Sequence, residues 1–393
     1  MKPKNLQASP GNPHKKNIIR LVVLAAIAAA GYYVAKLEFF HVVDVNNGNF
    51  YITRYPIVRE NWDHPRLKLL RESEKLDQVI APGKTEFEKI VLLRKWAHDQ
   101  WQGSSTTFYY PPWDALEILD LARNHGNKAF CAQYAIVFLQ ACLSLGIPAR
   151  YVDLPGHFAV EVWVNQYNRW AYMDPTSDIH FERDGIPVKG TLLSEGYWKD
   201  KYKDIVKVGP GGARTPATKE DLKILRMFSI VLRKNHLTRP IMISVNKGPY
   251  RPLTLQSDYR KYPLVGRDSV GFGEDFIAWD QEGETEFFYD KNRSHHADDF
   301  VSSFNQTMIY VGSDELNDND SIRLSLKHEN SPTFETFLCR SDRGSKFVPA
   351  DEVMLWPLHQ GFNTFYAKVR TRHGWEGPEA SIKVFFKRSW IKK

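Results

Sequence analysis

The chain has 393 residues, which is long enough for two domains that each bury a core. Hydrophobic residues make up 42% and charged residues 25%, a globular composition that excludes a disordered or fibrous chain. The formal net charge is +7, and five of these charges stand in the first twenty residues: Lys2, Lys4, Lys15, Lys16 and Arg20. Because 7 − 5 leaves +2 for all the other residues, the basic charge belongs mostly to one tail, and we expect no nucleic-acid partner.

An uncharged apolar run, LVVLAAIAAAGYYVA, follows this tail at residues 21–35. With its flanks through residue 40 the run is long enough for a membrane-spanning helix, which needs roughly 20 residues. Arg20 and Lys36 suit the two interfaces. We predict a cytoplasmic basic tail at 1–20, a single transmembrane anchor at 21–40 in the cell membrane, and an extracytoplasmic body. The alternative is a cleavable signal segment and a secreted protein, because AIAAAG offers small residues for cleavage.

Helical periodicity dominates the next part of the chain. The spacing of apolar residues predicts helices at 61–77 and 84–101, and Thr85 is expected to cap the second helix. The stretch DALEILDLARNHG predicts a short helix that ends at Gly126. A further helix begins at Cys131 and ends near Gly146, at GIP.

Three predicted strands come next, with the sequences ARYVDL, HFAVEVWV and RWAYMD, and NQYN forms a turn between the last two. The stretch VGPGGARTP, residues 208–216, predicts a linker or surface loop, and the capped helix TKEDLKILRMFSIVLRKNHL follows it. Beyond about residue 240 short alternating runs indicate an all-β region. Its last hairpin, GFNTFYAKVRTRHGWEGPEASIKVFF with HGWEGP as the turn, resembles the closing strands of immunoglobulin- or fibronectin-like modules.

The chain has three cysteines, which are too few for a disulfide scaffold and lack zinc-ligand spacing: Cys131, Cys142 and Cys339. We interpret Cys142 and Cys339 as core residues. Cys131 stands at a predicted helix N-terminus, where the helix dipole favours the nucleophilic thiolate. The histidines of SHHADD, residues 294–299, are typical of a solvated loop, so we expect no metal and no cofactor.

A thiolate nucleophile needs an imidazole in reach, and the imidazole needs a group that fixes its tautomer. His157 opens the second predicted strand and Asp174 closes the third. In an antiparallel hairpin with a two-residue loop they lie opposite each other. A four-residue loop shifts the pairing by two, and both side chains then still share a face.

The second strand has two distinct faces. One is wholly apolar and predicts a core face: Phe158, Val160, Val162 and Val164. The other carries His157, Ala159, Glu161 and Trp163, and we expect it to face the Cys131 helix, with Glu161 and Trp163 forming a cleft wall.

The fragments CAQYA, LGIPARYV, HFAVEVW and RWAYMDPT together resemble the transglutaminase-like superfamily of papain-type cysteine enzymes over roughly residues 84–180. The resemblance implies an α+β fold, a papain-like core with a helix packed on an antiparallel sheet. It implies that Cys131 is the nucleophile, His157 the general base and acid, and Asp174 the orienting residue. The sequence departs from the family pattern at KAF before the cysteine and at Phe158 after the histidine.

The predicted domains are therefore a catalytic domain at 41–207, a linker and helix at 208–240, and a β-rich domain at 241–393 that ends in an immunoglobulin-like sandwich. The oxyanion hole is expected to combine the Cys131 backbone N–H with one side-chain donor, for which Trp101 and Gln102 are candidates. We predict a protease, amidase or acyltransferase that acts on a polypeptide or glycoprotein of the cell envelope. The alternative is a non-catalytic binding module of the envelope.

Overall fold

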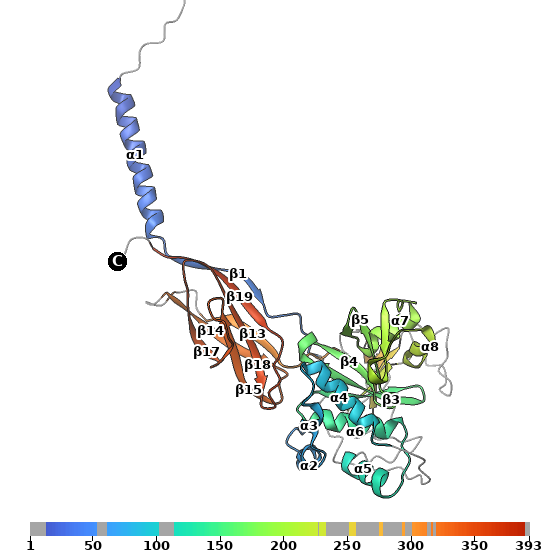
Figure 1. Cartoon of the computed structure of the whole chain (residues 1–393). Helices are drawn as coiled ribbons and strands as arrows, with labels where there is room; N and C mark the ends of the chain where they lie inside the picture. The colour runs from blue at the N-terminus through green and yellow to red at the C-terminus, as the bar shows by residue number, and fades with distance from the viewer. Residues whose placement is uncertain are drawn as a thin grey trace, which may run out of the picture.

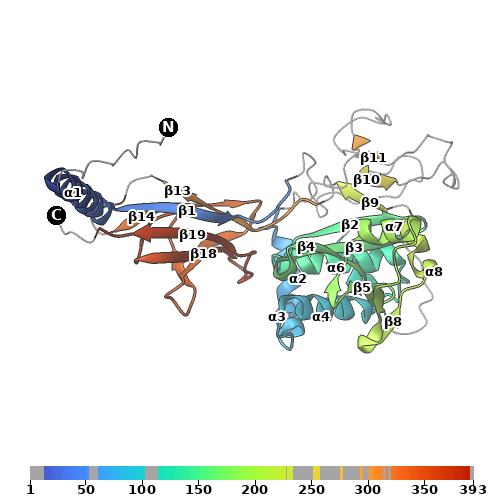
Figure 2. The ribbon, with the colours of Figure 1, turned by 90° about the horizontal axis from the view of Figure 1, so that it is seen from above.

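The computed structural model describes residues 13–52, 61–101, 114–226, 228–232, 251–256, 275–277, 293–294, 301–312, 316 and 320–389 (Figure 1). A long helix, α1 (Pro13–Lys36), stands at one end, next to a β-domain, and a mixed helical and sheet body follows it. Figure 2 shows the body and the β-domain side by side from above. The prediction of mixed helices and antiparallel sheet is confirmed.

The body begins with the predicted helices, which are α2 (Pro65–Ser73), α3 (Leu76–Ile80), α4 (Glu86–His98), α5 (Ala115–Asn124) and α6 (Cys131–Ser144). The predicted helix 61–77 is divided in two, because Lys75 adopts a positive φ of 50° between α2 and α3. The predicted cap of α4 forms a complete capping box, in which Thr85 Oγ1 accepts from Glu88 N at 3.2 Å and the Glu88 carboxylate accepts from Thr85 N.

The sheet of the body is antiparallel, and its central strands are the three predicted ones, β2 (Ala149–Leu154), β3 (His157–Val164) and β4 (Arg169–Asp174). It continues through β5 (Ile179–Arg183), β6 (Ile186–Pro187), β7 (Ile205–Val208) and β8 (Arg214–Pro216), with α7 (Gly190–Trp198) between β6 and β7. Val164 pairs with Arg169, so the β3–β4 loop has four residues, 165–168. This is the second loop length considered from the sequence, and it keeps residues 157 and 174 on one face.

Helix α6 covers the other face of β3 from the one we expected. Val160, Val162 and Val164 share a buried cluster with the side chains of α6, while Ala159 lies in a second cluster together with Leu193 of α7. The reason is that α6 is apolar along almost its whole length and therefore packs on the wholly apolar side of the strand. Both faces of the sheet are thus covered.

The prediction of a linker and a helix at 208–240 is wrong for the described residues. Helix α8 covers only Lys219–Leu222, a 3₁₀ turn follows at Lys223–Arg226, and β9 (Phe228–Leu232) then pairs with β2. Phe228 and Ile230 are fully buried in the second cluster, and this packing overrides the helical reading of the local sequence. The short strands β10 (Arg251–Gln256), β11 (Asp275–Ile277) and β12 (Arg293–Ser294) extend the same sheet rather than the β-domain.

The β-domain consists of two antiparallel sheets around one hydrophobic cluster. The first has the order β1 (Phe39–Asn46), β19 (Ala380–Lys387), β18 (Gly361–Thr371), β15 (Phe334–Ser341) and β16 (Val348–Ala350). The second has the order β13 (Gln306–Val311), β14 (Ser321–Glu329) and β17 (Val353–Pro357). The immunoglobulin-like assignment stays a prediction.

Strand β1 corrects the predicted domain boundaries. Its residues were assigned to the end of the membrane segment and the start of the catalytic domain, but Phe39 pairs with Lys387 and Asn46 with Ser381. The N-terminal strand therefore completes the edge of a sheet whose other strands come from the last sixty or so residues. Sequence order alone did not indicate this pairing, because it joins segments separated by the whole body.

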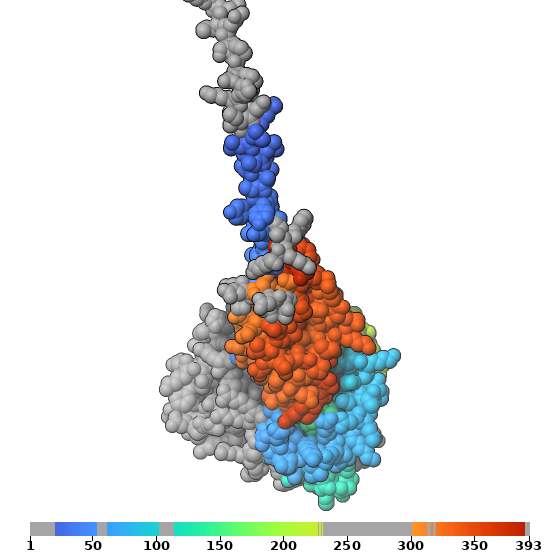
Figure 3. All heavy atoms as spheres, turned by 90° about the vertical axis from the view of Figure 1, so that its left-hand side faces the viewer, coloured from blue at the N-terminus to red at the C-terminus, as the bar shows by residue number. Residues whose placement is uncertain are grey.

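Helix α1 presents apolar side chains to the surroundings, and Figure 3 shows it standing out from the β-domain. Its side chains are described from Arg20, and those of Leu21, Val22 and Leu24 are each more than 60% exposed. Within the described part of the chain, no helix is long and apolar enough to cross a membrane. The predicted transmembrane anchor is therefore not confirmed.

The hairpin turn between β18 and β19 docks the β-domain on the body. Trp375 Nε1 donates to Leu145 O at 2.6 Å, and Arg71 Nη1 donates to His373 Nδ1 at 2.9 Å. The His373 ring lies directly on Gly146, where a Cβ atom would come within 2.2 Å of His373 Cδ2. Since residues 145 and 146 follow α6 directly, the turn predicted at HGWEGP holds the far end of the helix that begins at Cys131.

Replacing Gly146 by Ala tests this docking against a matched control. Gly146 and Gly126 both have positive φ (73° and 61°), but a Cβ at Gly126 meets no atom within 4 Å. We expect Gly126→Ala to lower the free energy of unfolding by about 1 kcal/mol. Gly146→Ala should lower it further, because the His373 ring must also move, and Gly146→Ala/His373→Ala should recover part of that difference. Denaturant unfolding gives the free energy of unfolding of all three variants. An equal loss of this free energy in Gly126→Ala and Gly146→Ala would contradict the docking.

Candidate active site

Cys131 is the first residue of α6 and is partly exposed. The N–H groups at the first helical positions have no acceptor within the helix, so they and the helix dipole provide positive potential beside the thiol. Gln133 Oε1 accepts from Phe130 N at 2.8 Å and fixes the start of the helix. This local geometry is the one predicted for a nucleophilic thiolate.

His157 connects the thiol to a carboxylate. Its Nε2 lies 3.0 Å from Asp174 Oδ2, and the Cys131 side chain is close enough to stabilise the charged form of the ring. Because Nε2 faces the carboxylate, Nδ1 is the nitrogen left for the thiol. The structure thus brings together the three residues that the sequence placed on a helix start and on two strand ends.

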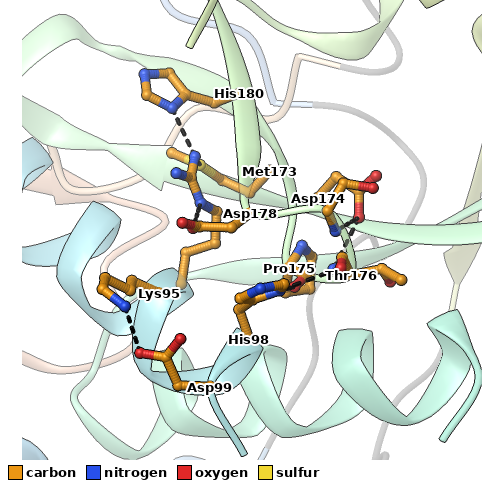
Figure 4. Close-up of polar contacts among 11 residues, drawn as sticks. Lys95, His98, Asp99, Met173, Asp174, Pro175, Thr176, Asp178 and His180 are labelled. Carbon is orange, nitrogen blue, oxygen red and sulfur yellow. Dashed lines mark hydrogen bonds and ion pairs between the residues drawn. The ribbon is translucent and has the colours of Figure 1, made fainter. Parts of the chain in front are cut away.

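Asp174 is almost fully buried and its two oxygens have different partners. Oδ1 accepts from the N–H groups of Thr176 at 2.9 Å (Figure 4) and Ser177 at 3.3 Å. Oδ2 faces His157. One oxygen therefore holds the carboxylate in its own turn while the other orients the imidazole. Such an arrangement fixes the tautomer and the ring orientation.

The neighbours of His157 favour its charged form. Burial by itself lowers the pKa of the imidazole, but the hydrogen bonds and charges of Asp174 and Cys131 outweigh burial and raise this pKa to about 10. The site is therefore suited to hold an imidazolium next to a sulfur nucleophile, as acyl transfer by a thiolate requires.

Helix α4 contributes two residues that sequence reasoning missed. His98 Nδ1 lies 3.1 Å from the carbonyl oxygens of Pro175 and Thr176 (Figure 4). Arg94 Nε donates to Asp178 Oδ1 at 2.8 Å. Arg94 had a sequence signal: it stands four residues after Ile90 on the apolar stripe of the helix, where a charged residue must find a buried partner.

Glu161 and Trp163 do not form a cleft wall, and this expectation is corrected. Both are fully buried, because the second face of the sheet is covered. Glu161 pairs with the buried Arg150 and accepts from Gly190 N at 2.6 Å. Trp163 packs in a separate aromatic cluster with Trp170 and Phe304.

Of the two predicted oxyanion donors, the structure describes only Trp101. The ring centroids of Trp101 and Tyr134 are 4.2 Å apart. Because Tyr134 is in the first turn of α6, Trp101 lies near the start of the helix. Gln102 lies outside the described residues, as do residues 295–299 of SHHADD. Within the described residues no group of three or more His, Cys, Asp or Glu side chains is arranged to hold a metal ion.

Comparison with known proteins bears on this site. Residues 74–175 match the family model of the transglutaminase-like superfamily. These residues are similar to the core of that superfamily, and residues 74–175 are called the transglutaminase-like core below. The match begins at the end of α2, stops one residue after Asp174, and so includes Cys131 and His157. The resemblance stated from the sequence motifs is thereby confirmed for this segment.

Part of the chain is also similar to a plant amidase. Over 112 residues the chain is 28% identical to a peptide-N(4)-(N-acetyl-beta-glucosaminyl)asparagine amidase of Oryza sativa subsp. japonica. The aligned part is 28% of this chain and 22% of the rice protein, so the chain spans about a fifth of the length of that curated relative. Together the two comparisons support an amidase-like enzyme family.

The raised pKa of His157 makes the stability of the fold depend on pH. The imidazole has an ordinary pKa of 6.5 and a folded-state pKa of about 10. Its stabilising contribution is therefore complete below about pH 6.5 and is lost as the pH rises through about 10. We expect the melting temperature of the native protein to exceed that of His157→Gln most at about pH 6, and the difference to shrink towards pH 10. A difference that stays constant over this range would contradict the hydrogen-bonded charged pair.

Proposed function

We propose that the chain is a transglutaminase-like cysteine enzyme that cleaves or transfers amide acyl groups through Cys131, His157 and Asp174. The observation that carries this proposal is the hydrogen bond between the His157 imidazole and the Asp174 carboxylate, close to the Cys131 thiol at the N-terminus of α6. The superfamily match over the same residues and the amidase relative support it.

The proposed reaction begins with attack of Cys131 Sγ on the amide carbonyl carbon, which moves the carbonyl electron pair to the oxygen. The Cys131 N–H is a donor for this oxyanion. The His157 imidazolium then protonates the amide nitrogen, and the C–N bond breaks. The amine departs, and the acyl group remains bound to Cys131 as a thioester. Water attacks the thioester, gives its proton to His157, and releases the acid and the thiolate. An amine in place of water gives transfer.

We propose a polypeptide or glycoprotein of the cell envelope as the substrate, and hydrolysis as the outcome. The name of the rice relative specifies the amide between N-acetylglucosamine and asparagine, so an N-glycopeptide is the first substrate to test beside an unmodified peptide. The shared chemistry is an amide whose acyl group becomes bound to Cys131. The identity of the leaving amine then separates a protease from a glycopeptide amidase.

Replacing Cys131 by Ala tests the nucleophile. We expect iodoacetamide to modify the native protein at Cys131, because Cys142 and Cys339 are buried. Burial also raises the pKa of both of these thiols, that of Cys339 to about 12. Cys131→Ala should lose the labelling and at least about 10³-fold of the turnover of a peptide or glycopeptide amide.

The matched control for this experiment is Cys339→Ala, which removes a buried thiol outside the site. In this variant iodoacetamide should still modify Cys131, and the substrate should be turned over at the native rate. Peptide mapping by mass spectrometry locates the label. A native protein in which Cys131 reacts no faster than a free thiol, and which cleaves neither substrate, would support the non-catalytic binding module instead.

We also propose that the exposed apolar side chains of α1 attach the chain to the cell membrane, with the transglutaminase-like core outside the cytoplasm. The run of exposed apolar side chains from Leu21 to Ile27 supports this, since such surface is unfavourable in water. The mature N-terminus in washed membranes is the test. A chain that begins at Met1 or Lys2 in the membrane fraction is the expected result. A soluble chain that begins near Gly31 would contradict anchoring and leave a secreted enzyme.

A further inference from the structure

The turn at residues 174–178, which links β4 to β5, determines where the Asp174 carboxylate points (Figure 4). Asp174 Oδ1 is bonded within the turn, to the N–H groups of Thr176 and Ser177. This leaves Oδ2 for His157 Nε2 at 3.0 Å. The carboxylate is therefore rigidly tied to the turn, and a displacement of the turn displaces the partner of the imidazole.

Helix α4 holds this turn at two points that are one helical turn apart. His98 Nδ1 lies 3.1 Å from both Pro175 O and Thr176 O, and since carbonyl oxygens only accept, Nδ1 carries the proton. Arg94 Nε donates to Asp178 Oδ1 at 2.8 Å. Asp178 has a φ of 53°, a left-handed conformation that non-glycine residues rarely adopt, and this conformation returns the chain into β5.

Arg94 is itself fixed from a second side. It is only 1% exposed, and its Nη1 lies 2.6 Å from His180 Nδ1. A guanidinium only donates, so Nδ1 of His180 accepts and Nε2 carries the proton to Glu182 Oε1 at 2.9 Å. Arg214 Nη2 donates to Glu182 Oε2 at 2.6 Å. The two carboxylates, Asp178 and Glu182, thus balance the charges of the two arginines, and His180 between Arg94 and Glu182 is neutral.

A charge network that is buried except at Arg214 is weak evidence for stability, because apolar residues of the same volume often stabilise a fold as well or better. Its best-supported use is to select one geometry among several. Here the geometry selected is that of the 174–178 turn, and the turn carries the carboxylate that faces His157. The Coulombic interaction of Asp174 with Arg94 agrees with this close arrangement.

We propose that Arg94 and His98 are positioning residues, through which α4 sets the orientation of the Asp174 carboxylate and thereby of the His157 ring. The inference rests on the proposed function and deepens it. Both residues bind the turn, and their effect on the Cys131 thiol passes through Asp174 and His157.

The first test replaces His98. His98→Phe keeps a ring for the contact with Tyr134 but removes the N–H donor, whereas His98→Asn keeps an amide N–H close to the position of Nδ1. We measure the pH profile of iodoacetamide alkylation at Cys131, together with the midpoint of unfolding. His98→Phe should slow alkylation at neutral pH about 10-fold and move the pH profile towards that of Asp174→Asn. His98→Asn should restore most of the native profile.

The second test replaces Arg94. Removing it alone leaves the Asp178 carboxylate buried without its partner, so the variant is Arg94→Met combined with Asp178→Asn. It should displace the pH profile in the same direction as His98→Phe. If this double variant does not fold, the pH profile of His98→Phe alone tests the proposal.

Two controls on α4 separate positioning from stability. Ile90→Val trims a fully buried side chain and should lower the unfolding midpoint but keep the native pH profile. Lys95→Ala breaks an exposed pair with Asp99 and should change neither. If the variants of His98 and Arg94 behave like Ile90→Val, the inference is overturned while the proposed function stands. If Asp174→Asn itself alkylates like the native protein, the proposed function fails, and the positioning role with it.

Discussion

The burial of α6 is the constraint on which the rest of the structure depends. Almost every residue of this helix after Cys131 is buried, between the valine face of β3 and the helices α2, α4 and α5. A helix enclosed on all sides cannot rotate or slide without losing apolar contacts and opening cavities. Its N-terminus, and with it the Cys131 thiol, is therefore fixed relative to the sheet that carries His157 and Asp174.

The far end of the same helix is held by the β-domain. Trp375 donates to Leu145 O, and the His373 ring occupies the space beside Gly146. The aromatic cluster of Trp163, Trp170 and Phe304 forms a second junction between the body and the segment that precedes β13, where Trp170 Nε1 donates to Val301 O. The β-domain thus packs against the transglutaminase-like core at two places and closes over a helix end that would otherwise face solvent.

Two buried ionic networks flank the sheet, and each has a complete set of partners. Arg150 pairs with Glu161, which also accepts from Gly190 N, on the face that α7 covers. Arg94 of α4 pairs with Asp178 and His180. An unpaired charge at either position would cost several kcal/mol in desolvation, so the networks form only in one register of strands and helices. They select a geometry, and the second one lies next to the proposed catalytic carboxylate.

The sequence by itself determined the local structure and the candidate site. The helix cap at Thr85 and the strand that begins at His157 are read from short-range signals, and the structure contains both. An even-length loop sufficed to keep His157 and Asp174 on one face, because side chains alternate along a strand. The family resemblance of these fragments did not require the fold to be known.

Tertiary structure decided which surfaces meet. Alternation shows that β3 has two faces but not which one a helix covers, so Glu161 and Trp163 were misplaced. The stretch around Phe228 and Ile230 became a strand because its apolar side chains complete a core assembled from distant segments. Strand β1 pairs with β19 across the whole chain. Such choices depend on the burial of one segment against another far away in sequence, and a local pattern carries no information about its distant partner.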